Sequence, residues 1–126
     1  MNRKRVYIAG PIVVGDLGHN IGQATDAFFA LLKAGLAPLC PHLSCWSGGP
    51  LTAADGTYYA VAEVLPRGTT VADWYESTLP WVDVADALVR LPGYGKGTDG
   101  EVARAEEKGV PVFYSVEDVL AWAGAA

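Results

Sequence analysis

The sequence predicts a single α/β domain over residues 1–126, in which helices cover both faces of a mainly parallel sheet of four or five strands. Short apolar runs alternate with stretches of helical periodicity, which implies crossover connections between parallel strands. A length of 126 residues suits one domain of ordinary size. Hydrophobic residues make up 51% of the chain and charged residues 18%, which excludes general disorder. We therefore expect a three-layer fold of the Rossmann-like or flavodoxin-like kind.

Four apolar runs predict the strands, and the first of them ends in the turn signal Gly10-Pro11. Two prolines in or just after the second run, Pro38 and Pro41, favour a place at the edge of the sheet or at a strand end. The expected strands cover residues 6–9, 36–40, 85–91 and 110–114.

Helical periodicity fills most of the chain between these runs. Asn20 is expected to cap the first helix, Gly35 to end it, Pro80 to stop a later one and Ser115 to cap the last. Residues 44–70 are the least regular part and are too long for a bare connection. The expected helical segments cover residues 20–34, 73–78, 98–108 and a stretch after 115, with a short helix possible over 60–65.

Composition limits the partners. Fourteen acidic and nine basic residues give a net charge of −5, which argues against a nucleic-acid polymer because phosphate neutralisation needs basic patches. No run of eighteen apolar residues predicts a membrane span. The basic start is not followed by the uninterrupted apolar stretch of a signal peptide, so a cytoplasmic location is expected.

Cys40, His42 and Cys45 form a pattern that could hold zinc, but no fourth ligand follows at a usual spacing. Two reduced, half-buried thiols are the preferred interpretation, and no metal site is expected.

Ligands of such folds bind beyond the carboxyl ends of the strands. That rule selects Gly10-Pro11, residues 42–46, residues 92–97 and Ser115. The third place is rich in glycine and precedes a helix, so its amides could receive an oxygen-rich ligand. From spacing alone, Thr98 and Glu101 read as a capping box, in which the glutamate bonds back to the cap amide.

Three motifs together resemble the nucleoside 2-deoxyribosyltransferase-like superfamily, which includes transferases and nucleoside 5'-monophosphate N-glycosidases. The resemblance covers nearly the whole chain, which looks closest to small bacterial and phage members. The motifs are Tyr7-Ile8-Ala9-Gly10-Pro11-Ile12, Pro41-His42, and residues 85–93 followed by Gly97-Thr98-x-x-Glu101.

The resemblance implies that Glu101 attacks the anomeric carbon of a nucleoside or nucleotide and forms a glycosyl-enzyme. A carboxylate suits an oxocarbenium-like transition state, which it can stabilise and then trap. Tyr7 would lie at the end of the first strand and hold Glu101 through its hydroxyl. Hydrolysis and base transfer share this first half-reaction, neither needs a metal or cofactor, and relatives act as homodimers or larger homo-oligomers.

The substrate would be bound by the glycine loops and by aromatic side chains. Trp46 could stack on a base and His42 could bond its edge, or Trp46 could close the core. Relatives carry Asp or Ser where this chain has Gly95, and Asp73 and Glu76 are the nearest candidates for an acid that assists the base. The remaining expected binding residues are Gly10, Pro11, Gly93, Lys96, Gly97 and Thr98.

A non-catalytic nucleotide-binding module on the same fold is the alternative, and a structural partner in a larger assembly is a third possibility. Geometry discriminates among them. A Tyr7 hydroxyl that reaches the Glu101 carboxylate beside an open pocket favours the enzyme, whereas a glutamate folded back onto the Thr98 amide favours the capping box.

Overall fold

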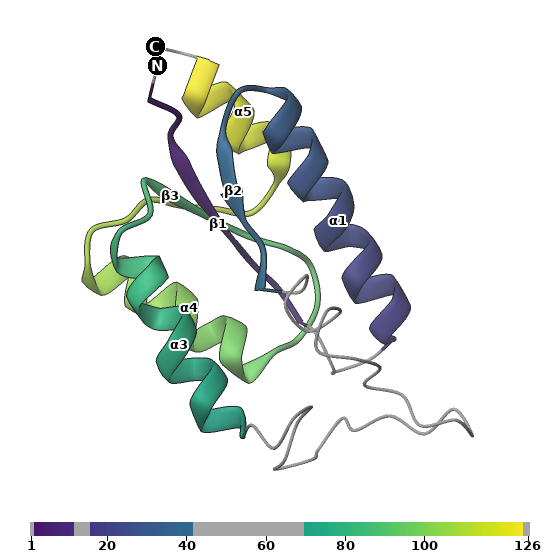
Figure 1. Ribbon diagram of the computed structural model, residues 1–126, viewed down its shortest axis with the longest axis vertical. Coiled ribbons are helices and arrows are strands. Elements are labelled where there is room, and N and C mark those ends of the chain that lie inside the picture. Colours follow the sequence, from purple (N-terminus) through teal and green to yellow (C-terminus); the bar gives the residue numbers. More distant parts are fainter. Residues whose placement is uncertain (1, 12–15, 42–69, 125–126) are drawn as a thin grey trace.

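The computed structural model describes residues 2–11, 16–41 and 70–124. Within them, four parallel strands form one sheet in the order β2-β1-β3-β4 (Figure 1). The expected fold class is confirmed, with a sheet of four strands. The strands are β1 (Arg5–Ala9), β2 (Ala37–Leu39), β3 (Ala87–Arg90) and β4 (Val112–Phe113).

The second strand lies at an edge of the sheet, as its prolines predicted. In the register of the pair, Pro38 lies beside Val6, while the amide of Ala37 donates to the carbonyl of Lys4 at 2.9 Å. Residues of a strand alternate in hydrogen-bond direction, so Pro38 occupies a position whose amide would otherwise face outward. The missing N–H makes this edge a poor template for another strand.

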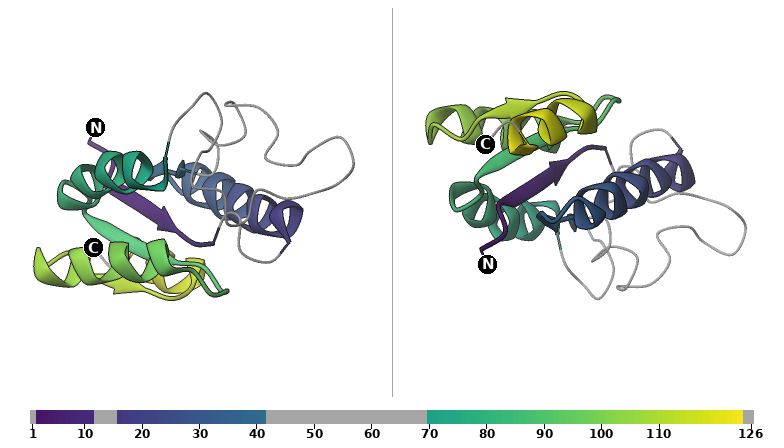
Figure 2. Two further views of the ribbon diagram at one scale, coloured as in Figure 1. Left: turned by 90° about the horizontal axis from the view of Figure 1, so that it is seen from below. Right: turned by 90° about the horizontal axis from the view of Figure 1, so that it is seen from above.

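Helices cover both faces of the sheet, giving three layers (Figures 1 and 2). One layer packs α1 against α5, and the other packs α3 against α4. The helices are α1 (Leu17–Lys33), α3 (Val71–Asp83), α4 (Lys96–Glu107) and α5 (Val116–Gly124). No helix in the described parts of the chain is both long and apolar enough to cross a bilayer.

Alternate side chains of β1 enter two separate cores. Val6 and Ile8 pack toward α1 and α5, whereas Tyr7 and Ala9 pack toward α3 and α4. This follows from the two-residue period of a strand. The near-continuous burial of β1 is that of a central parallel strand covered on both faces.

Two helix boundaries differ from the sequence prediction. Asp16 caps α1, its carboxylate accepting from the amide of His19 at 2.9 Å, and Asn20 instead lies buried inside the helix. Pro80 does not stop α3, which continues to Asp83. Val82, in the turn after the proline, is fully buried, and we attribute the continuation of the helix to this packing, which outweighs the missing hydrogen bond of the proline.

Other helix ends follow local rules. Thr70 and Asp73 form a reciprocal capping box at the start of α3, with hydrogen bonds of 2.8 and 3.1 Å. Ser115 accepts from the amide of Asp118 at 3.1 Å and caps α5, as expected. Thr98 is not a cap, because α4 begins at Lys96 with Gly95 as its N-cap.

The strand order places a topological switch between β1 and β3. The chain moves outward from β1 to β2 on one side and from β3 to β4 on the other. The loops after β1 and β3 therefore leave the same edge in opposite directions, which is where open α/β sheets bind ligands.

Candidate active site

The two glycine-containing loops meet at this switch point. Gly93 has φ +119°, and a Cβ added there would lie 2.7 Å from Cγ of Pro11. A Cβ on Gly95 would lie 2.7 Å from Oγ1 of Thr98 and 3.6 Å from Cα of Pro11. The loops thus pack against each other with no room for side chains, and Gly93 also needs a backbone conformation that favours glycine.

Close packing also constrains Gly95. A side chain at this position would displace the Thr98 side chain. Thr98 itself is only 3% exposed, so its hydroxyl packs beneath the loop.

The first turn of α4 presents backbone amides at this edge. Gly95 supplies no side-chain cap, so the amides of Lys96, Gly97 and Thr98 rely on other acceptors. The side chain of Lys96 is exposed. Arg90, at the end of β3, pairs with Asp99 at 2.6 Å and adds a cation beside the turn.

The decisive side-chain contact joins β1 to α4. The Tyr7 hydroxyl donates a hydrogen bond to Oε2 of Glu101, a residue ninety-four positions later in the chain. Tyr7 lies in the middle of β1, not at its end as expected, and is 1% exposed. Glu101 lies in the second turn of α4, too far into the helix to be its N3 residue, so the capping-box interpretation is wrong.

Thr78 of α3 completes this cluster. Its side chain lies within hydrogen-bonding reach of the Glu101 carboxyl group and of the Tyr7 hydroxyl. Strand β1 and helices α3 and α4 thus each supply one polar side chain to an otherwise apolar layer that includes Val82 and Leu88. A polar group is retained in such a layer only when it is hydrogen-bonded.

Burial dominates the titration of this cluster. It raises the pKa of Glu101 to about 7, although the hydrogen bonds from Tyr7 and Thr78 act in the opposite direction. Burial, together with the charge of the Glu101 carboxylate and the hydrogen bond to it, raises the pKa of Tyr7 far above its usual value. Tyr7 therefore keeps its proton and acts as a hydrogen-bond donor.

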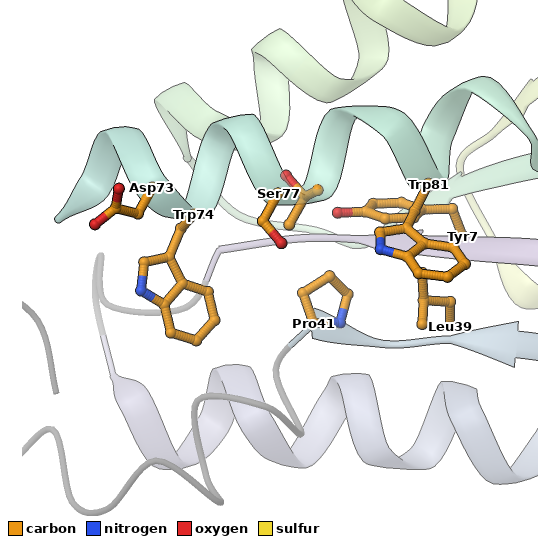
Figure 3. A pocket seen from close by; sticks show the side chains of 8 residues that line it. Tyr7, Leu39, Pro41, Asp73, Trp74, Ser77 and Trp81 are labelled. Atoms are coloured by element: carbon orange, nitrogen blue, oxygen red, sulfur yellow. The ribbon is translucent and has the colours of Figure 1, made fainter. Parts of the chain in front are cut away.

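A cavity of about 340 Å³ adjoins the cluster between α3 and the edge strand β2 (Figure 3). Its inner wall includes Tyr7 and Thr78, and its sides carry the indole rings of Trp74 and Trp81 (Figure 3). Glu101 is not among the described residues that line it, but its carboxylate accepts the hydrogen bond of Tyr7, which does line it. The other lining residues are Leu39, Pro41, Asp73 and Ser77.

The structure brings together Tyr7 and Glu101, and separately the loops that carry Gly10, Pro11 and Gly93. His42 and Trp46 lie outside the described residues, as do Cys45 and the short helix expected over 60–65. Of the proposed zinc ligands only Cys40 is described, and its side chain is buried. In the described part of the chain, no three His, Cys, Asp or Glu side chains are grouped so as to hold a metal ion.

Acidic side chains of α3 differ in position from one another. Asp73 lies at the cavity and Glu76 is exposed. Asp83 forms a bidentate pair with Arg104 at 2.6 and 2.8 Å, which ties α3 to α4. The Arg104 guanidinium lowers the pKa of Asp83 through these hydrogen bonds.

Thr78 and Trp81 were missed by the sequence analysis. Trp74, Thr78 and Trp81 follow the spacing i, i+4, i+7 that marks one helix face. Because the sequence analysis took Pro80 as the end of this helix, the pattern was cut before Trp81. A threonine hydroxyl between two tryptophans on one face is the signal that could have identified the cavity wall.

Comparison with known proteins gives no match: no protein-family model fits the chain, and no curated protein is significantly similar to it.

Proposed function

We propose that this protein cleaves the N-glycosidic bond of a nucleoside or nucleoside 5'-monophosphate through a covalent glycosyl-Glu101 intermediate. The observation that carries the proposal is the hydrogen bond from Tyr7, which lines an aromatic cavity, to a partly buried Glu101. This arrangement agrees with the resemblance of the sequence motifs to nucleoside 2-deoxyribosyltransferase-like proteins.

In the first half-reaction, a carboxylate oxygen of Glu101 bonds to the anomeric carbon. The C–N bond breaks, its electron pair goes to the base, and the base takes up a proton. In the second half-reaction, water or another base attacks the same carbon and gives up a proton to solvent, which balances the proton taken up by the first base, and Glu101 leaves as a carboxylate. No electron is gained or lost overall, so the cycle needs no redox partner.

Tyr7 and Thr78 assist by keeping Glu101 ionised in an apolar layer. Burial alone favours the neutral acid, which cannot attack carbon. Each hydrogen bond donated to the carboxylate favours the charged form. Because the pKa of Glu101 is about 7, kcat/KM should rise with pH up to this value.

The surrounding surfaces supply substrate binding in this proposal. The indole of Trp74 offers a flat face for a base, and Asp73 lies at the same cavity as an acid that could protonate it. Amides of the first turn of α4, with Lys96, are available for sugar hydroxyls or a 5'-phosphate. On the same resemblance we propose a homodimer or larger homo-oligomer that requires no metal or cofactor, and we keep the cytoplasmic location as an expectation from the sequence.

One observation favours a second candidate function. Glu101 is not among the described residues that line the cavity, so the same cavity is also suited to binding a nucleoside without cleaving it. A non-catalytic nucleotide-binding module would keep the cavity and use the cluster only to link α3, α4 and β1.

The test is release of free base from a panel of ribo- and deoxyribonucleosides and their 5'-monophosphates. We expect release by the parent protein and none by Glu101→Gln, which keeps the shape but cannot act as a nucleophile. Addition of a second base then separates transfer from hydrolysis. Binding without release from any substrate would contradict the enzyme and support the binding module.

A further inference from the structure

The proposed chemistry gives Thr78 only an effect on the charge of Glu101, but its place in the structure also suits it to orient the carboxylate. Thr78 lines the cavity. From α3, its side chain also lies within hydrogen-bonding reach of the carboxyl group of Glu101, which belongs to α4. Tyr7 makes the corresponding contacts from β1. Two hydroxyl groups on two different elements therefore connect the lining of the cavity to the carboxylate.

The number of hydroxyl hydrogens decides which groups donate and which accept in these bonds. Tyr7 and Thr78 each have one hydroxyl hydrogen, whereas an ionised carboxylate accepts several hydrogen bonds and donates none. Tyr7 places its hydrogen on Oε2 of Glu101. The Thr78 hydrogen is best placed on the same carboxylate, because this is the charged acceptor of the cluster.

We propose that Thr78 is a positioning residue that, together with Tyr7, holds the ionised Glu101 carboxylate in a fixed orientation beside the cavity. This role rests on the proposed function of Glu101 as a nucleophile. With two donors from fixed elements, the carboxylate has one defined orientation, whereas Tyr7 alone would leave it free to turn about that single bond.

The surroundings make Glu101 sensitive to this contact. Its pKa reflects burial and the hydrogen bonds from Tyr7 on β1 and Thr78 on α3. Cys40, which follows β2, also raises the pKa of Tyr7. Asp73, the carboxylate among the lining residues, lies one helical turn before Ser77 and is held in the capping box of α3. Loss of the Thr78 hydroxyl therefore leaves a buried carboxylate with less support, and its pKa rises.

The test compares Thr78→Val, which keeps the shape and removes the hydroxyl, with Thr78→Ser, which restores the hydroxyl. Glu101 is titrated without substrate, by carbon NMR of its labelled carboxyl group. We expect its pKa to rise by about one pH unit in the valine variant and to return toward the parent value in the serine variant. Ser77→Ala removes a neighbouring cavity hydroxyl and should leave this titration unchanged.

The second readout is the pH profile of kcat/KM for base release. In Thr78→Val its acid limb should move upward together with the pKa of Glu101, with a loss of roughly tenfold or more at neutral pH. Thr78→Ser should recover most of this loss.

An unchanged titration in Thr78→Val, or a serine variant that behaves like valine, overturns the role of Thr78. A shifted titration with an unmoved kcat/KM profile also overturns it, because the contact would then be structural only. A parent protein that releases no base overturns the proposed function itself, and the NMR titration distinguishes that failure from a missing contact between Thr78 and Glu101.

Discussion

The two faces of the sheet are built from the same strands but differ in chemistry. The face under α1 and α5 is lined by aliphatic side chains such as Ile8, Leu31 and Val89, with the Cys40 thiol among them. The face under α3 and α4 contains Tyr7, with Glu101 and Thr78 against it. Neighbouring residues of β1 therefore differ in their surroundings: Ile8 packs in the aliphatic core, and Tyr7 belongs to the polar cluster. The comparison indicates that one face is an apolar core, whereas the other includes a carboxyl group whose pKa is raised by burial.

The largest effect should come from breaking the apolar face. Leu31 is fully buried in α1, so Leu31→Ala should lower the free energy of unfolding by about 2–5 kcal/mol through lost burial and a cavity. Urea denaturation measures this loss. Base release per folded molecule should stay at the parent value, and a large fall in it would contradict the division of labour between the faces.

The face under α3 and α4 should make the free energy of unfolding depend on pH. An unfolded glutamate titrates near 4.5, whereas burial raises the pKa of Glu101 to about 7 in the native protein. The unfolded state therefore loses this proton first, and the stability present below pH 4.5 is lost as pH rises to about 7. At roughly 1.4 kcal/mol per pH unit, the loss over this interval is about 3 kcal/mol.

Glu101→Gln should not show this loss, because its amide stays neutral. Denaturation of both proteins between pH 4 and 8 gives the difference. The free energy of unfolding of the glutamine variant should increase relative to that of the parent as pH rises, and the difference should stay constant above pH 7. Parallel stability curves for the two proteins would mean that Glu101 is not buried in an unfavourable environment.

The smallest change in the free energy of unfolding is expected at the packed loops that carry Pro11 and Gly93. Gly93→Ala meets Pro11 and an unfavourable φ, so it should cost about 1–2 kcal/mol. Gly100→Ala is the matched control, since a Cβ there meets nothing within 4 Å inside α4. That change should add about 0.5–1 kcal/mol of stability. Equal effects of the two substitutions in thermal denaturation would contradict the packed loops.

Most of the fold was predictable from the sequence because it depends on local patterns. The strands of the sheet, the edge position of Pro38 and the cap at Ser115 follow from apolar runs and turn chemistry. The end of α3 did not, because burial of Val82 beyond Pro80 is a tertiary effect that no local rule contains.

The candidate site was predictable only in part. The motif resemblance pointed to Glu101 and Tyr7, which the structure brings into contact. Spacing alone favoured the capping box, because it cannot show that α4 starts at Lys96 and carries Glu101 into its second turn. Helical spacing could have placed Thr78 on the cavity face, but its contact with Glu101 was not predictable, since that contact arises from the packing of α3 against α4.

The most direct test of the central claim is whether Glu101 becomes covalently glycosylated. A nucleoside analogue with fluorine at C2', which slows both half-reactions, is incubated with the protein, and intact mass spectrometry followed by peptide mapping locates the label. We expect a mass increase equal to the sugar without its base, on the peptide that contains Glu101, and no increase in Glu101→Gln. A label on another residue, or base release without any dependence on Glu101, would contradict the account.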